Sequence, residues 1–145
     1  MQIITKIINS TIYVTITDVE SDIKNDFDNF SATWKKFYVE KKYFTFRIDT
    51  TSLTRPNILY CYKMAKLIRE FKDCSTQYLK YSIMIIPNPY VRYLLNLIMR
   101  IQKPVATIYV TKNNIEANSL YNYKLDNSVF LETFILLNNI SVIES

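Results

Sequence analysis

The stretch Ser82–Val110, SIMIIPNPYVRYLLNLIMRIQKPVATIYV, is the part of the chain that decides its fold. It is apolar enough to suggest a membrane span or a lipid-binding wall, and a span needs about 20 unbroken apolar residues. Within the 20 residues 82–101, two prolines, two asparagines and two arginines interrupt the run. Pro87-Asn88-Pro89 would end a strand, because proline cannot donate a ladder hydrogen bond and restricts the residue before it. The stretch therefore predicts a buried strand, a turn, a helix and the next strand.

Strand patterns recur on both sides of this stretch. Apolar and polar residues alternate over 11–17, 43–49 and 105–112, which is typical of half-buried strands. Residues 2–8 indicate a further strand, and Asn9-Ser10 would join it to the next as a hairpin turn. Residues 81–87 are apolar on both faces, as in a central strand.

Helical spacing separates these strands. Ser21 would cap a first helix that ends near Lys41, Pro56 would begin a second, and a third is expected over 90–102. Each carries an apolar stripe, and the three stripes are Ile23/Phe27/Phe30/Trp34/Phe37, Ile58/Cys61/Ala65/Ile68/Phe71 and Val91/Leu94/Leu95/Leu97/Ile98/Ile101. A short helix is expected over 113–125. Residues 128–144 fit a helix, a pair of strands, or one of each.

The order β-β-α-β-α-β-α-β-α predicts the fold class. Strands that alternate with helices favour a mostly parallel or mixed sheet, here of about five strands. Four of the strands place aliphatic residues on one face and Thr, Tyr or Arg on the other. We therefore expect an α/β two-layer sandwich, with helices mainly on one face and the other face half open. We expect one domain over 1–145, with 126–145 as a C-terminal extension that packs on it.

The composition excludes several kinds of site. The 145 residues include no Gly and no His. A phosphate loop and a dinucleotide fingerprint need Gly, whereas a Ser-His-Asp relay and an imidazole metal site need His. Two cysteines, Cys61 and Cys74, are too few for a zinc site. We expect no catalytic residues, no cofactor and no metal, so the chain is not expected to be an enzyme.

The charges are dispersed. Asp18, Glu20, Asp22, Asp26 and Asp28 would suit a hard cation, but the acidic start of a helix explains them better. The net charge of +5 permits weak attraction to nucleic acid or anionic lipid, yet no basic run exceeds two residues. We therefore do not expect nucleic acid as a partner. The AT-rich codon usage that the composition implies suggests a microbe, a parasite or a large DNA virus.

The start of the chain does not read as a signal peptide. We therefore expect a reducing compartment and two free thiols, with Cys61 buried and Cys74 more accessible. The expected location is the cytoplasm, or the host cytoplasm or virion if the protein is viral.

Three local patterns carry a family resemblance over roughly residues 3–125. In FRIDTTSLTRPNILYCYKMAKLI a strand that ends in Asp49 leads through a loop into a helix, and NPYVRYLLNLIMRI and VTKNNIEANSL follow in order. Together they resemble the STAS (anti-sigma-factor-antagonist, SpoIIAA-like) fold. That resemblance implies a regulatory protein-interaction module with a phosphorylated hydroxyl in an Asp-Ser-x-Gly stretch. Here the stretch is TSLTRPN without Gly. Ser52 and Thr54 are the nearest matches, and they would otherwise serve as loop and capping hydroxyls.

The segment IMIIPNPYVRYLLNLIMRIQKPVATIYV carries a second resemblance, to the CRAL-TRIO lipid-binding domain. It implies binding of a lipid or a small apolar ligand. In that family additional helices enclose the ligand, and this chain is too short to contain them.

The preferred hypothesis is a non-catalytic module that binds another protein or itself, and the alternative is a carrier of a lipid or small apolar ligand. The loops at the carboxyl ends of parallel strands are the usual site in such sheets. The expected partner-binding residues at this rim are Asp49, Ser52, Thr54, Asn88, Arg92 and Arg100. The expected residues of the open sheet face are Tyr13, Arg47 and Tyr109.

Overall fold

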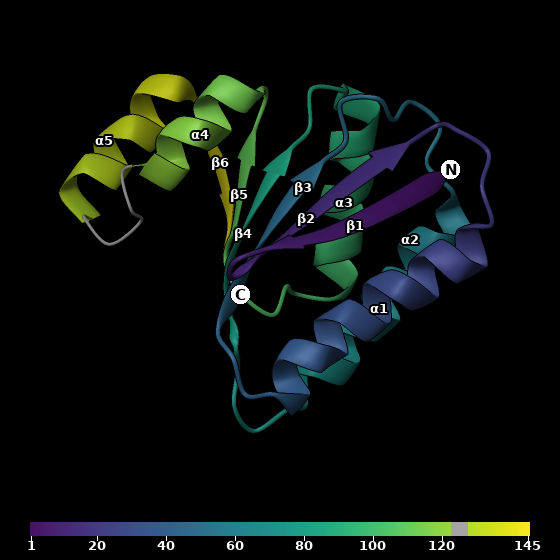
Figure 1. The fold of residues 1–145 in the computed structure, drawn as a ribbon. Coiled ribbons are helices and arrows are strands. Elements are labelled where there is room, and N and C mark those ends of the chain that lie inside the picture. The colour runs from purple at the N-terminus through teal and green to yellow at the C-terminus, as the bar shows by residue number, and fades with distance from the viewer. Residues whose placement is uncertain (123–127) are drawn as a thin grey trace.

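The computed structural model describes residues 1–122 and 128–145, which form one mixed sheet of six strands and five helices (Figure 1). The strands are β1 (Gln2–Ile8), β2 (Thr11–Thr17), β3 (Phe44–Asp49), β4 (Leu79–Ile85), β5 (Ile108–Thr111) and β6 (Ser141–Ile143). They lie in sequence order across the sheet. β2 to β5 are parallel, and β1 and β6 pair antiparallel at the two edges.

Three helices join the parallel strands, namely α1 (Ile23–Val39), α2 (Ile58–Lys72) and α3 (Pro89–Ile101). Each connection moves one strand further in the same direction, so the right-handed crossover rule places all three on the same face. The predicted α/β sandwich with helices mainly on one face is confirmed. The sheet has six strands because residues 128–144 contain one helix and one strand.

The remaining helices, α4 (Asn114–Asn122) and α5 (Ser128–Asn138), lie on the opposite face at the β4–β5 end of the sheet (Figure 1). Ala117 and Leu120 of α4 pack with Ile83 and Ile85 of β4. This covers only part of the face, and β1 to β3 remain bare there. Part of the helix expected over 113–125 and the first residues of the extension 126–145 fall in 123–127, outside the described residues.

Three details of the helices differ from expectation. Asp22, not Ser21, caps α1, because its carboxylate accepts from the Asn25 amide at 3.2 Å. Ile58 of α2 is 57% exposed, since the helix turns Tyr60 and Leu67 inward instead. Leu97 and Ile101 are also exposed, because α3 buries a narrower face centred on Val91 and Leu95.

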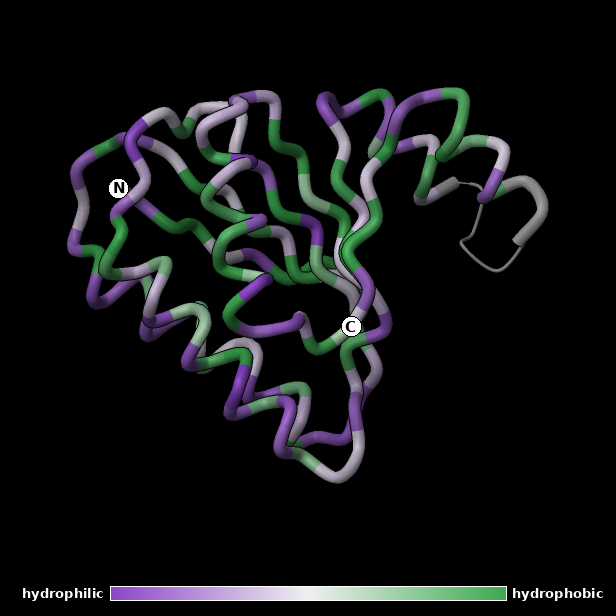
Figure 2. Tube along the Cα trace, turned by 180° about the vertical axis from the view of Figure 1, so that it is seen from behind, coloured by the Kyte–Doolittle hydropathy of each residue, from purple (hydrophilic) through white to green (hydrophobic). Residues whose placement is uncertain are grey.

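The first helical stripe is buried as predicted. Phe30, Trp34 and Phe37 are all buried in the main core cluster, and Ile23 and Phe27 pack against it. Figure 2 shows hydrophobic positions alternating with hydrophilic ones along the helical coils at the lower left, where α1 and α2 lie, as expected for helices with one buried side. In the described part of the chain no helix combines the length and the apolar character that crossing a membrane requires.

Candidate functional site

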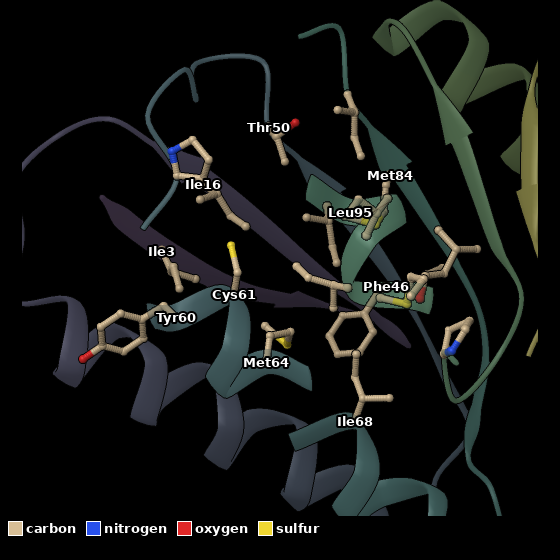
Figure 3. A pocket seen from close by; sticks show the side chains of 18 of the residues that line it. Ile3, Ile16, Phe46, Thr50, Tyr60, Cys61, Met64, Ile68, Met84 and Leu95 are labelled. Carbon is tan, nitrogen blue, oxygen red and sulfur yellow. The ribbon is translucent and has the colours of Figure 1, made fainter. Parts of the chain in front are cut away.

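An apolar cavity of about 160 Å³ lies between the sheet and the helix layer (Figure 3). Cys61, Met64 and Ile68 of α2 line one side of it, and Phe46 and Met84 of the sheet face them. Residues of α1, α3, β1, β2 and β5 complete the lining, among them Ile3, Ile16, Trp34, Leu95 and Ile108. The cavity is partly open to the surface. Elements from most of the chain therefore converge on one hollow.

The sequence leaves this volume empty because small side chains occupy lining positions. Ala106 is 8% exposed and Ser82 is 5% exposed, so both are interior positions that a larger residue would fill. Cys61 is a third small residue in the wall. Protein interiors normally pack to crystal-like density, so a void of this size in the core of a small domain is unusual.

The lining is uncharged. Thr50 contributes a hydroxyl, but it already donates to the Ile85 carbonyl at 2.8 Å. Burial raises the pKa of the Cys61 thiol, so Cys61 stays neutral near pH 7. The two further hydroxyl groups among the described lining residues belong to Tyr60 and Ser82. Such a surface suits a neutral apolar molecule, because an isolated charge is costly to bury.

A loop that contributes to the cavity is held in place by Asp18. Its carboxylate accepts from the Thr54 amide, from the Thr54 hydroxyl at 2.6 Å and from the Arg55 amide at 2.8 Å. These bonds, led by the Thr54 hydroxyl, lower the pKa of Asp18 to about 2. Leu53 and Pro56 from this loop line the cavity. No local sequence pattern indicates this role, because the carboxylate and its donors are 36 or more residues apart.

The residues expected at the rim have local structural roles. Asp49 accepts from the amide and hydroxyl of Thr51, which closes a turn after β3. Asn88 caps α3 by accepting from the amides of Tyr90 and Val91. Thr54 bonds Asp18, as described above. Ser52 is exposed, and its carbonyl accepts from the Asp18 amide.

The expected arginines do not form one site. Arg92 lies in the first turn of α3, near Asn88, and its Nε is buried without a hydrogen-bond partner among the described residues. Arg100 lies in the last turn, about 12 Å away along the helix, so it is not a rim residue.

The three residues expected on the open sheet face are also divided. Tyr13 and Arg47 are neighbours in the β2–β3 register, and the Arg47 guanidinium donates to Asn114 of α4 at 3.3 Å. Tyr109 packs against the cluster that α4 and α5 form with β4, and burial raises its pKa. Tyr109 is therefore partly covered, contrary to expectation, because the C-terminal helices occupy its half of the face.

These features define a single-sheet α/β domain with an internal apolar cavity. Comparisons with protein-family models, with curated proteins and with solved structures found no match for this chain.

Proposed function

We propose that the protein is a non-catalytic binding module that takes a small, neutral, apolar molecule into the cavity between its sheet and helices α2 and α3. The observation that carries this proposal is the cavity itself, a hollow of about 160 Å³ with an uncharged lining. This corresponds to the apolar-ligand carrier that was the alternative expectation from the sequence.

The size of the cavity limits the ligand. Apolar cavities of roughly 150 Å³ stay dry and bind benzene or xenon. A volume of about 160 Å³ therefore suits one small ring or a short length of hydrocarbon chain. Transfer of such a group from water contributes about 0.8 kcal/mol for each buried CH₂. Met64, Met84 and Met99 in the lining can adapt to different shapes, because methionine is unbranched and flexible.

Thermal unfolding with toluene tests the proposal. A ligand that binds only the folded state raises the melting temperature as its concentration passes Kd. We expect toluene to stabilise the wild-type protein. Ala106→Leu should remain folded and lose this response, because its side chain occupies the cavity. Leu136→Ala, at an α5 position that is 80% exposed, should keep the response.

Cys61→Leu provides a second filled cavity if Ala106→Leu does not fold. No toluene response in the wild-type protein, or an equal response in the filled variants, would refute the proposal.

We also propose that the protein works in a reducing compartment such as the cytoplasm. Cys61 and Cys74 are free, and roughly 17 Å of helix separates Cys61 from the end of α2 at Lys72, two residues before Cys74, which is too far for a disulfide.

Protein interaction, the preferred expectation from the sequence, is the second candidate. The observation that favours it is an apolar stripe on the outer side of α3, formed by Tyr90, Tyr93, Leu97 and Ile101, which are 52%, 62%, 42% and 64% exposed. Contiguous exposed apolar surface often marks a protein-binding site.

Native mass spectrometry separates the two candidates. A co-purified small molecule supports the carrier, whereas a stable oligomer or a bound protein supports the interaction module. In the second case Leu97→Asp should abolish the complex, and Leu136→Asp on α5 should leave it intact. A complex that survives Leu97→Asp would exclude the α3 stripe.

A further inference from the structure

The net positive charge of the chain is concentrated on two helices. Of the 18 basic and 13 acidic residues, α2 and α3 hold six and one, which leaves twelve of each sign elsewhere. These two helices therefore carry a net charge of +5, equal to that of the whole chain. Basic residues that look scattered along the sequence are gathered by the fold. The six are Lys63, Lys66, Arg69, Lys72, Arg92 and Arg100.

The helix dipole explains only part of this charge. A basic residue is favourable in the last turn of a helix, where Arg69 of α2 and Arg100 of α3 lie. Lys63 and Lys66 lie in the middle of α2, and Arg92 lies in the first turn of α3, where the dipole disfavours it. Binding of an anionic partner would account for the basic residues that the dipole does not.

Apolar side chains stand among these charges on the outer sides of both helices. On α2, the exposed Tyr62, Lys66 and Arg69 follow one another at helical spacing. On α3, the exposed apolar stripe described above ends beside Arg100. The Arg69 guanidinium donates to the Gln102 side-chain carbonyl at 3.2 Å, so α2 and α3 lie side by side at their carboxyl ends. Together they present one surface that is both basic and apolar.

A surface of this composition suits an anionic membrane. Basic side chains attract acidic lipid headgroups, whereas tyrosine and aliphatic side chains enter the boundary between headgroups and acyl chains. A nucleic acid would use the charges but not Leu97 or Ile101, because binding to its phosphates is electrostatic. The 13 residues of α3 span about 20 Å, less than the hydrocarbon core of about 30 Å, so α3 would lie along the membrane surface.

We propose that the outer surface of α2 and α3 docks on a membrane that contains anionic lipid. Docking goes beyond the proposed function and does not need an occupied cavity. Its consequence for the cavity rests on that function. α2 and α3 also line the cavity, and their lining residues Cys61, Met64 and Leu94 are partly exposed. The docked protein holds the cavity beside acyl chains, which are a source of apolar ligand.

Co-sedimentation of the full chain with lipid vesicles tests the docking surface. One set of vesicles contains equal parts of phosphatidylserine and phosphatidylcholine, and the other contains phosphatidylcholine alone. We expect the wild-type protein to bind only the first set, and to bind it more weakly as the salt concentration rises. Lys66→Gln/Arg100→Gln should weaken this binding about 20-fold to 30-fold, because each basic residue near an anionic surface contributes about 1 kcal/mol.

A matched pair of lysines away from the surface controls for net charge. Lys6 lies on β1 and Lys112 follows β5, and both are exposed. Lys6→Gln/Lys112→Gln removes the same two charges and should bind the vesicles as the wild-type protein does. An equal loss of binding in the two double variants would show that net charge alone is responsible, and the docking surface would be wrong.

Ile101→Ala tests the apolar half of the surface. Ile101 is 64% exposed, so the variant should fold and should bind phosphatidylserine vesicles about threefold to tenfold more weakly through lost apolar burial. Binding to heparin, a soluble polyanion, should be unchanged. Leu136→Ala on α5, also exposed, should affect neither. If Ile101→Ala leaves vesicle binding unchanged, the contact is purely electrostatic and the membrane assignment is wrong.

The remaining outcomes separate docking from the proposed function. No binding of the folded wild-type protein to phosphatidylserine vesicles overturns the docking proposal, and a protein complex that Leu97→Asp abolishes then assigns the α3 stripe to a protein. Vesicle binding without a toluene response supports docking and refutes the carrier. A toluene response without vesicle binding does the reverse. Melting curves of each variant confirm that it is folded.

Discussion

The two halves of the helix layer cover the same face of one sheet, yet one is solid and the other hollow. Under α1, aromatic rings fill the space. Trp34 stacks on Phe71 with ring centroids 4.2 Å apart and meets Phe46 edge-on at 5.0 Å. Toward α3, the lining consists mainly of aliphatic and methionine side chains around the cavity. The aromatic cluster forms one wall of that cavity.

This difference indicates that the hollow is local. The same chain packs large rings closely a few ångströms away, so its composition does not prevent dense packing. Small residues at lining positions, such as Ser82 and Ala106, keep the second half open. Binding in that half requires the other half to hold the sheet and α2 in place.

Two buried leucines give the largest expected difference between the halves. Leu67 is 5% exposed in the solid cluster, and Leu95 is 8% exposed in the cavity wall. Leu67→Ala should cost about 3–4 kcal/mol and Leu95→Ala about 2 kcal/mol, because a side chain beside a void has fewer contacts to lose. Denaturant unfolding measures both. Equal costs would mean that the two halves are packed alike.

Two buried alanines sharpen the comparison by adding volume. Ala106→Leu fills the cavity and should raise the free energy of unfolding by about 0.5–2 kcal/mol. Ala117, on α4, is 0% exposed in a packed cluster. Ala117→Leu should destabilise the protein by about 1–3 kcal/mol through overpacking. Thermal and denaturant melts report both changes, and destabilisation of similar size at the two positions would contradict the cavity.

Asp18 connects stability to pH through the loop beside the cavity. Its pKa is lowered from 3.8 to about 2, so its contribution is complete above pH 3.8 and is lost as the pH falls toward 2. Asp18→Ala should therefore be less stable than the wild-type protein at neutral pH. We expect the two unfolding midpoints to converge between about pH 4 and pH 2. A difference that stays constant over this range would show that the Asp18 charge is not involved.

The sequence predicted the layers well, because periodicity reports which side of an element is buried. The Phe30/Trp34/Phe37 stripe and the doubly apolar strand β4 are clear cases. The bounds were less exact where several residues can cap a helix, as Ser21 and Asp22 both can. Residues 128–144 were ambiguous, because apolar runs of that length suit both helices and strands.

The cavity was not predictable from the sequence. Its volume depends on which side chains from eight helices and strands meet in space, and no local pattern records that. The rim residues were proposed from their position at strand ends. Asp49 and Asn88 do lie at strand ends, but Asp49 closes a turn and Asn88 caps helix α3.

The two thiols give the smallest expected effect, a difference in labelling rate. Cys74 is exposed, and Cys61 lies in the cavity wall with its pKa raised by burial. A thiol reagent should modify Cys74 first, because the thiolate is the reactive form and Cys61 is largely protonated. Toluene should slow Cys61 further and leave Cys74 unchanged. Protection of both thiols, or of neither, would argue against toluene in the cavity.

The most direct test is a crystal structure determined under xenon pressure. Xenon occupies dry apolar cavities and scatters strongly, so it reports the hollow without any assumption about the natural ligand. We expect a xenon atom between Phe46, Met64 and Leu95, at the cavity shown in Figure 3. Helices α2 and α3 closed against the sheet, with no xenon between these three side chains, would contradict it.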